Sequence, residues 1–171
     1  CTAALWSPET GVVDGHGYML ALRGEIEDHG GVIALNAPVQ RVTPLAGGGF
    51  RVATGGAEAA TLTCRRVVNS GGLHAQRVAR SVDGFPVEHI PQLVLAKGSY
   101  FVCGGRQAFS RLVYPAPVDG GLGVHVTLDL GGRMKFGPDV EWLASDDPDS
   151  IDYTVDPRRA NSFYDAIRRY C

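Results

Sequence analysis

Residues 65–81, RRVVNSGGLHAQRVARS, contain the turn that decides the fold. A short apolar run, Val67–Val68, leads into the small and polar residues Asn69–Gly72, and a segment with helical spacing follows over 73–82. A strand that breaks into glycines and continues as a helix is typical of α/β proteins whose backbone lies close to a cofactor. The complete dinucleotide-binding pattern G-x-G-x-x-G does not occur in the sequence. The turn therefore points to a cofactor without identifying it.

The residues before this turn predict a helix and two extended runs. Asp14 is a good N-cap, and the spacing of Tyr18, Leu22 and Ile26 gives one apolar helical stripe. Gly30 is suited to end this helix. We expect strands over 32–35 and 39–45 and a hairpin over 50–64 that turns at residues 55–56.

The character of the sequence changes after residue 83. Strand signals dominate over 92–138, with turns expected at residues 104–105, 119–121 and 131–132. Pro157 then precedes a helical segment and suits its first turn. We therefore predict an α/β fold plus an antiparallel sheet. Residues 1–84 form a partial cofactor domain in this prediction, and residues 85–171 form a mainly antiparallel substrate domain with a C-terminal helix.

The composition is that of an ordinary globular protein. The 171 residues are 44% hydrophobic and 20% charged, with a net charge of −2. This balance argues against a nucleic-acid surface, and no apolar run reaches the length of a membrane span. The cysteines, which are widely separated, predict reduced thiols, no metal site and a cytoplasmic location; they are Cys1, Cys64, Cys103 and Cys171.

Several motifs occur in an order that resembles a known family. They are SPETGVVDGHGYMLAL, GGVIALNAPVQRV, RRVVNSGGLHAQRVAR, KGSYFV, LVYPAPV and GLGVHVTLDLGGRMKFGPDVEW. Together they resemble the FAD-dependent oxidoreductases of the D-amino-acid oxidase superfamily, and most closely the L-2-hydroxyglutarate dehydrogenase-like branch. The resemblance covers nearly the whole chain. It implies an internal fragment of a flavoprotein whose N-terminal G-x-G-x-x-G segment lies before Cys1.

The resemblance implies a set of cofactor-binding residues. Val39 follows the proline of NAPVQRV, and in similar flavoproteins the backbone of this residue contacts the FAD adenosine. The turn containing Ser70, Gly71 and Gly72 is similar to a second strand-to-helix crossover of an FAD domain, where glycines let the backbone lie against the cofactor. FAD is therefore expected in the parent protein, and its binding by this chain alone is left open.

Four residues of the second half are candidates for contact with a small carboxylate substrate. Oxidation of a 2-hydroxy acid needs a base for the hydroxyl proton, and His125 carries the side chain best suited to that transfer near neutral pH. Thr127 alternates with His125 and shares its sheet face. The phenols of Tyr100 and Tyr114 can bond a carboxylate. Lys97, also considered as a carboxylate partner, is more typical of a surface charge.

Three interpretations remain open from the sequence. The first is a fragment of an FAD-dependent oxidoreductase that oxidises a small 2-hydroxy acid. The second is an amine or amino-acid oxidase of the same fold, of the glycine or sarcosine type. The third is a chain that is non-catalytic and free of flavin in isolation. Apolar runs at 32–36 and 66–69 would be left exposed in a fragment that lacks the first strand and helix of the FAD domain. This predicts that the isolated chain either self-associates through a truncated sheet edge or repacks.

Overall fold

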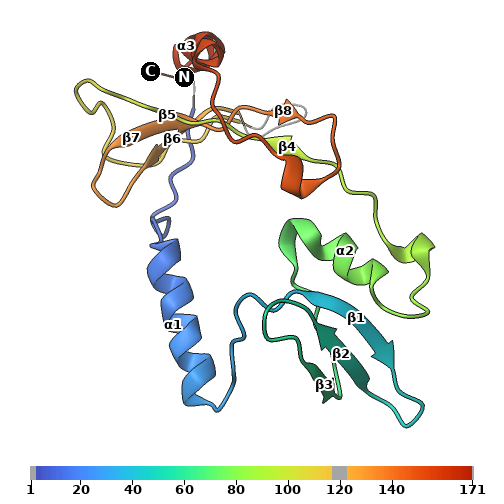
Figure 1. Ribbon diagram of the computed structural model, residues 1–171. Helices are drawn as coiled ribbons and strands as arrows, with labels where there is room; N and C mark the ends of the chain where they lie inside the picture. Colours follow the sequence, from blue (N-terminus) through green and yellow to red (C-terminus); the bar gives the residue numbers. More distant parts are fainter. Residues whose placement is uncertain (1–2, 117–122, 171) are drawn as a thin grey trace. The chain divides into compact units, whose positions relative to one another are not determined.

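The computed structural model describes residues 3–116 and 123–170 of the chain. They belong to two compact units. Unit 1 contains Cys1–Leu22, Leu95–Ser145 and Ser150–Cys171, and unit 2 contains Arg23–Val94 and Asp146–Asp149. The helices and strands of both units are labelled in Figure 1.

A three-stranded antiparallel meander forms the sheet of unit 2 (Figure 1). Its strands follow one another in the order β1 (Val39–Pro44), β2 (Phe50–Thr54) and β3 (Thr61–Cys64). Val42 pairs with Val52 across β1 and β2, and both side chains are buried. This confirms the predicted hairpin of β2 and β3 and the predicted extended run over 39–45.

The predicted helix after the glycine turn is present but shorter than expected. A 3₁₀ turn, Gly72–His74, leads into α2 (Ala75–Arg80). Behind α2 the backbone returns to the sheet, because the amide of Val42 donates to the Ser81 carbonyl and the amide of Asp83 donates to the Val42 carbonyl, at 3.0 and 2.8 Å. These bonds tie the end of α2 to β1.

Two predicted strands do not form. Residues 32–35 and 66–69 lie outside every strand of the structure, and their side chains are exposed: Val32 is 89% and Val68 is 85% accessible. A strand needs a neighbour that accepts and donates its backbone hydrogen bonds. Neither run has such a neighbour among the described residues. The expected exposure of apolar surface is thus confirmed, whereas self-association stays a prediction.

Unit 1 contains two antiparallel sheets. The larger has the order β5 (Phe101–Val102), β7 (Met134–Gly137) and β6 (His125–Leu128), and the smaller pairs β4 (Ala96–Lys97) with β8 (Glu141–Trp142). A further bridge joins Val113 to Val126 on the free side of β6. The antiparallel character predicted for this part of the chain is confirmed. The turn expected at 131–132 is also confirmed, whereas the turn expected at 119–121 lies outside the described residues.

The core of unit 1 lies between the larger sheet and the last helix, α3 (Ala160–Ile167). Val126, Met134 and Phe163 are almost completely buried. The Phe163 ring meets the Phe101 ring edge-on, with 4.9 Å between the ring centroids. Pro157 occupies the turn before α3, as predicted. Burial of these large side chains supplies the main stabilisation of this unit.

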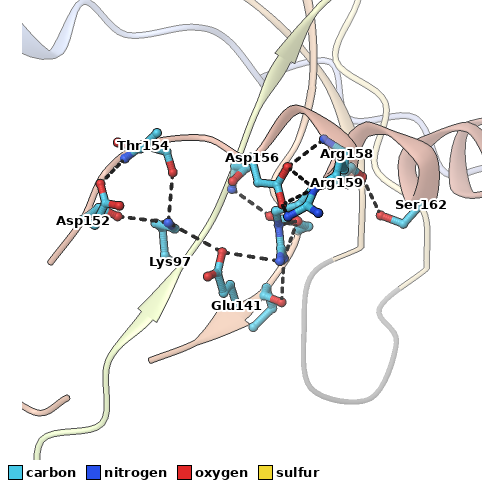
Figure 2. A network of polar contacts seen from close by, with 11 residues as sticks. Lys97, Glu141, Asp152, Thr154, Asp156, Arg158, Arg159 and Ser162 are labelled. Atoms are coloured by element: carbon cyan, nitrogen blue, oxygen red, sulfur yellow. Dashed lines mark hydrogen bonds and ion pairs between the residues drawn. The ribbon is translucent and has the colours of Figure 1, made fainter. Parts of the chain in front are cut away.

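Charged residues connect the smaller sheet to the segment before α3 (Figure 2). Lys97 points toward the backbone of that segment, and its Nζ donates to the carbonyls of Asp152 and Thr154 at 3.0 and 3.1 Å. Its Nζ also lies 3.6 Å from the Glu141 carboxylate, and only 13% of the side chain is accessible. Lys97 is therefore a structural cross-link in unit 1 and not the solvated surface charge that the sequence favoured.

The predicted first helix is confirmed as α1 (Gly15–Asp28). The Asp14 carboxylate accepts hydrogen bonds from the amides of His16 and Gly17, each at 3.1 Å, so that Asp14 acts as the N-cap. Gly30 follows the helix with a φ of +76°, the left-handed conformation that glycine adopts without a steric penalty. The predicted apolar stripe is exposed: Tyr18, for example, is 59% accessible.

Within the described ranges, no helix is both long and apolar enough to cross a membrane. The same residues contain no group of three or more His, Cys, Asp or Glu side chains arranged to hold a metal ion. Cys64 and Cys103 are free, half-buried thiols. The other two cysteines lie outside the described residues.

Candidate functional site

The predicted substrate residues of unit 1 lie in one row across its larger sheet. His125 pairs with Gly137, and Phe101 pairs with Phe136, which sets Tyr100 opposite Gly137. The bridge of Val113 to Val126 sets Tyr114 opposite His125 in the same way. Directly opposed residues of antiparallel strands share a face of the sheet. The register thus brings Tyr100, His125 and Tyr114 to one face.

The side chain of His125 is the buried member of this row. Only 5% of the residue is accessible. The Tyr114 ring lies against its imidazole, with 4.2 Å between the ring centroids and an interplanar angle of 52°. Tyr114 itself is 55% accessible, so that its ring covers the histidine while its outer part stays in solvent. The pair therefore combines a titratable group held in place with a partly exposed phenol beside it.

Tyr100 lies at the other end of the row. Partial burial raises the pKa of the Tyr100 phenol above its ordinary value, and the neighbouring Tyr114 phenol adds to that rise because two phenolates would repel each other. The Tyr100 phenol consequently stays protonated at neutral pH and is able to donate a hydrogen bond. This is the state that a carboxylate ligand requires.

Thr127 lies on the same sheet face as His125, but its hydroxyl hydrogen is already used in a hydrogen bond. Its Oγ1 donates to the Lys135 carbonyl of β7 at 3.4 Å. The oxygen keeps its two lone pairs, with which it is able to accept a bond. The structure thus places Thr127 on the strand of His125, with its donor already used by the sheet.

The predicted cofactor residues lie in unit 2. Val39 begins β1, where a bulge separates it from Arg41, and it is 40% accessible. Ser70, Gly71 and Gly72 form an exposed turn that Asn69 holds in shape. The side chain of Asn69 donates from Nδ2 to the Ala75 carbonyl at 2.8 Å and accepts from the Gly71 amide at 3.1 Å.

Gly71 and Gly72 are suited to this turn for different physical reasons. A Cβ at Gly71 would lie 3.2 Å from the Ala75 nitrogen, so that Gly71 serves the close packing of the turn on the helix. Gly72 has a φ of +56°, and a Cβ there would meet no atom within 4 Å. The backbone at Gly72 is therefore open to a ligand. An open, exposed glycine turn fits the approach of a large planar cofactor such as FAD.

Unit 2 contains a cluster of charged side chains that was not predicted from the sequence. Nε2 of His74 and Nη2 of Arg77 each lie 2.8 Å from the Asp149 carboxylate. Hydrogen bonds from His74 and Arg77 lower the pKa of Asp149. A cavity of about 250 Å³ adjoins the cluster and is lined in part by Leu73, Arg80 and Leu93. The sequence could not predict this cluster, because nothing local to the acidic stretch 146–150 reveals a partner about seventy residues away.

Comparison with known proteins decides the family. The whole chain, residues 1–171, matches the family DAO, described as FAD dependent oxidoreductase. The chain belongs to this family. Its resemblance to the D-amino-acid oxidase superfamily is thereby confirmed, and FAD is the cofactor of the family to which the parent protein belongs.

Three relatives show which branch of the DAO family is similar to this chain. The mitochondrial L-2-hydroxyglutarate dehydrogenase of Arabidopsis thaliana is 37% identical over 99% of the chain and 42% of its own length. Proteins of the same name from Caenorhabditis elegans and Pongo abelii are 33% and 24% identical, each over 79% of the chain and over 32% and 34% of their own lengths. The chain thus spans less than half the length of these relatives.

The same relatives correct one prediction. All three carry the word mitochondrial in their names, which contradicts the cytoplasmic location expected from the cysteines. Reduced thiols are not specific to the cytoplasm. The cysteine pattern therefore could not distinguish the two compartments.

Proposed function

We propose that the protein containing this chain oxidises a small 2-hydroxy acid, L-2-hydroxyglutarate first among them, with FAD as the electron acceptor. The observation that carries the proposal is the row of Tyr100, His125 and Tyr114 in a DAO-family chain 37% identical to an L-2-hydroxyglutarate dehydrogenase. The names of the relatives also support a mitochondrial protein.

His125 acts as the base in this proposal. An imidazole nitrogen of His125 takes the proton of the substrate hydroxyl while the hydrogen on the same carbon leaves as hydride. Burial and the Tyr114 ring hold the imidazole in one place, which is the requirement for efficient proton transfer. FAD, when bound, supplies the acceptor for the hydride.

Tyr100, Tyr114 and Thr127 bind and orient the substrate. The phenol hydroxyls of the two tyrosines donate to a carboxylate oxygen, and the Thr127 side chain contacts the carbon chain of the substrate. Val39, Ser70, Gly71 and Gly72 hold the cofactor. Their backbone is exposed, and Gly72 leaves space for close approach. In this proposal residues 1–84 belong to the FAD-binding domain and residues 85–171 to the substrate domain.

The test is anaerobic reduction of the full-length protein loaded with FAD. We expect L-2-hydroxyglutarate to abolish the absorbance of the oxidised flavin, whereas D-2-hydroxyglutarate, glycine and sarcosine leave it unchanged. Reduction by glycine or sarcosine instead would assign the protein to the amine oxidases of the same fold. An FAD-loaded protein that none of the four compounds reduces would exclude the proposal.

A further inference from the structure

Gly137 lies between Tyr100 and His125 in the row described above. It pairs with His125 on one side and lies opposite Tyr100 on the other. A Cβ at Gly137 would lie 2.6 Å from Cδ1 of Tyr100 and 2.6 Å from the Ser99 carbonyl oxygen. The Tyr100 ring therefore lies across the position that a side chain at residue 137 of β7 would occupy.

Asp139 holds the backbone from which that ring projects. Its Oδ1 accepts a hydrogen bond from the amide of Ser99 at 2.8 Å. Ser99 is 2% accessible, so this amide has no access to solvent and depends on Asp139 for a partner. The bond fixes the chain one residue before Tyr100.

Arg159 in turn fixes Asp139. Its Nε donates to Oδ2 of Asp139 at 2.6 Å, and the Asp139 side chain is only 12% accessible. Nη1 of Arg159 also lies 3.4 Å from the Glu141 carboxylate, and Nη2 donates to the Val140 carbonyl at 3.3 Å. Figure 2 shows Arg159 at the centre of these contacts. The Asp139 carboxylate thus binds the Ser99 amide through Oδ1 and is held by Arg159 through Oδ2.

We propose that Gly137 and Asp139 are positioning residues for Tyr100: Gly137 leaves the space for its ring, and Asp139 fixes its backbone. The inference rests on the proposed function, in which the Tyr100 phenol binds the substrate carboxylate. Neither residue was a candidate from the sequence, although the GP pair at 137–138 belongs to a motif that carries the resemblance.

The test compares variants of the full-length FAD-loaded protein. Gly137→Ala should lower kcat/KM for L-2-hydroxyglutarate about 100-fold, because a misplacement of about 1 Å has an effect of that size. Asp139→Ala should lower it at least about 10-fold, and Asp139→Asn should give a smaller loss, because its one side-chain oxygen still accepts from the Ser99 amide while the bond from Arg159 is lost. Gly104→Ala is the control, because a Cβ at Gly104 meets no atom within 4 Å.

Two further measurements separate positioning from a general loss of structure. In the Tyr100→Phe background, Asp139→Ala should add little to the loss of kcat/KM, because both changes act on the same phenol. The Tyr100 phenol, titrated by NMR and assigned with Tyr100→Phe, should return toward its ordinary pKa in Gly137→Ala and Asp139→Ala. If Asp139→Ala does not fold, Gly137→Ala, which leaves the ion pair intact, provides the same test.

The outcomes distinguish this inference from the proposed function. A wild-type protein inactive on 2-hydroxy acids overturns the proposed function, whereas the Tyr100 titration still reports the position of the ring. When the wild type is active, two results overturn the inference. The first is an equal loss of activity in Asp139→Ala and Asp139→Asn. The second is a Gly137→Ala variant that leaves both kcat/KM and the Tyr100 titration unchanged.

Discussion

The ring of Tyr114 covers the imidazole of His125, with 4.2 Å between the two centroids. The contact joins β6 to the segment that pairs with its free side, and it holds the one buried histidine among the described residues. It therefore determines where a proton acceptor would lie in unit 1.

His125→Asn tests the proposed base. The amide of asparagine fills a similar space but does not take a proton, so kcat should fall about 10²- to 10⁴-fold while KM changes little. Steady-state turnover of L-2-hydroxyglutarate by the full-length protein measures both constants. Tyr114→Phe is the matched comparison: it keeps the ring contact and should mainly raise KM. An unchanged kcat in His125→Asn would remove His125 from the mechanism.

Gly72→Ala tests the proposed cofactor turn, with Gly84→Ala as its control. Both glycines have positive φ, +56° and +73°, and neither would place a Cβ within 4 Å of another atom. Both substitutions should therefore cost a similar stability, about 1 kcal/mol. Only Gly72→Ala should weaken FAD binding, by about 10-fold, measured by titrating FAD into the full-length apoprotein. Equal effects on FAD affinity would count against the turn as a cofactor contact.

Asp83 makes the folding stability of unit 2 depend on pH in the acidic range. Its carboxylate accepts from Thr43 Oγ1 at 2.7 Å and from Arg41 Nε at 2.9 Å. These hydrogen bonds, the one from Thr43 first, lower the pKa of Asp83 from 3.8, its ordinary value. A lowered pKa stabilises the folded state above 3.8, and this stabilisation is lost as the pH falls through the folded-state pKa.

Thermal unfolding at a series of pH values checks this effect. The melting temperature of wild type should fall more steeply below about pH 4 than that of Asp83→Asn, because the asparagine has no proton to gain. Thr43→Val should reduce the steepness in part. Parallel pH curves for wild type and Asp83→Asn would show that Asp83 has the same pKa in both states.

Ser99→Ala should leave the protein at least as stable as wild type. The Ser99 hydroxyl is buried and has no hydrogen-bond partner among the described residues. Its removal relieves a desolvation cost, so we expect the free energy of unfolding to rise by up to about 1 kcal/mol. Ser162→Ala is the comparison in the same unit, because Ser162 Oγ donates to the Arg159 carbonyl at 2.9 Å. Denaturant unfolding measures both, and a loss in Ser99→Ala larger than in Ser162→Ala would contradict the expectation.

The local elements were largely predictable from the sequence, because their signals are local. Asp14 caps α1, Gly30 follows its end, and Pro157 precedes α3, as their chemistry requires. The wrong strands, 32–35 and 66–69, show the limit of this reasoning. An apolar run indicates that a segment is able to join a sheet, but only a partner strand completes its hydrogen bonds.

The sequence predicted Tyr100, His125 and Tyr114 as candidates, but it did not predict that they lie in one row. The alternation of His125 and Thr127 gave the face, but the register of three other segments decides what lies opposite. Asp139 is the clearest omission, since its partner Ser99 lies forty residues earlier in the sequence. Contacts of this kind depend on strand pairing, and no local pattern reports them.

The way each unit is assembled has a consequence for the order of folding. The meander of unit 2 joins strands that follow one another between residues 39 and 64, whereas unit 1 pairs Ala96 with Trp142 and bonds Tyr170 to the carbonyl of Val124. Sheets built from neighbouring strands close short loops and form quickly, and sheets built from distant segments form slowly. During synthesis the meander is therefore complete while the strand that pairs with β4 has not yet been made. The pairing of β4 with β8 is a late step of folding, because it waits until Trp142 has been made.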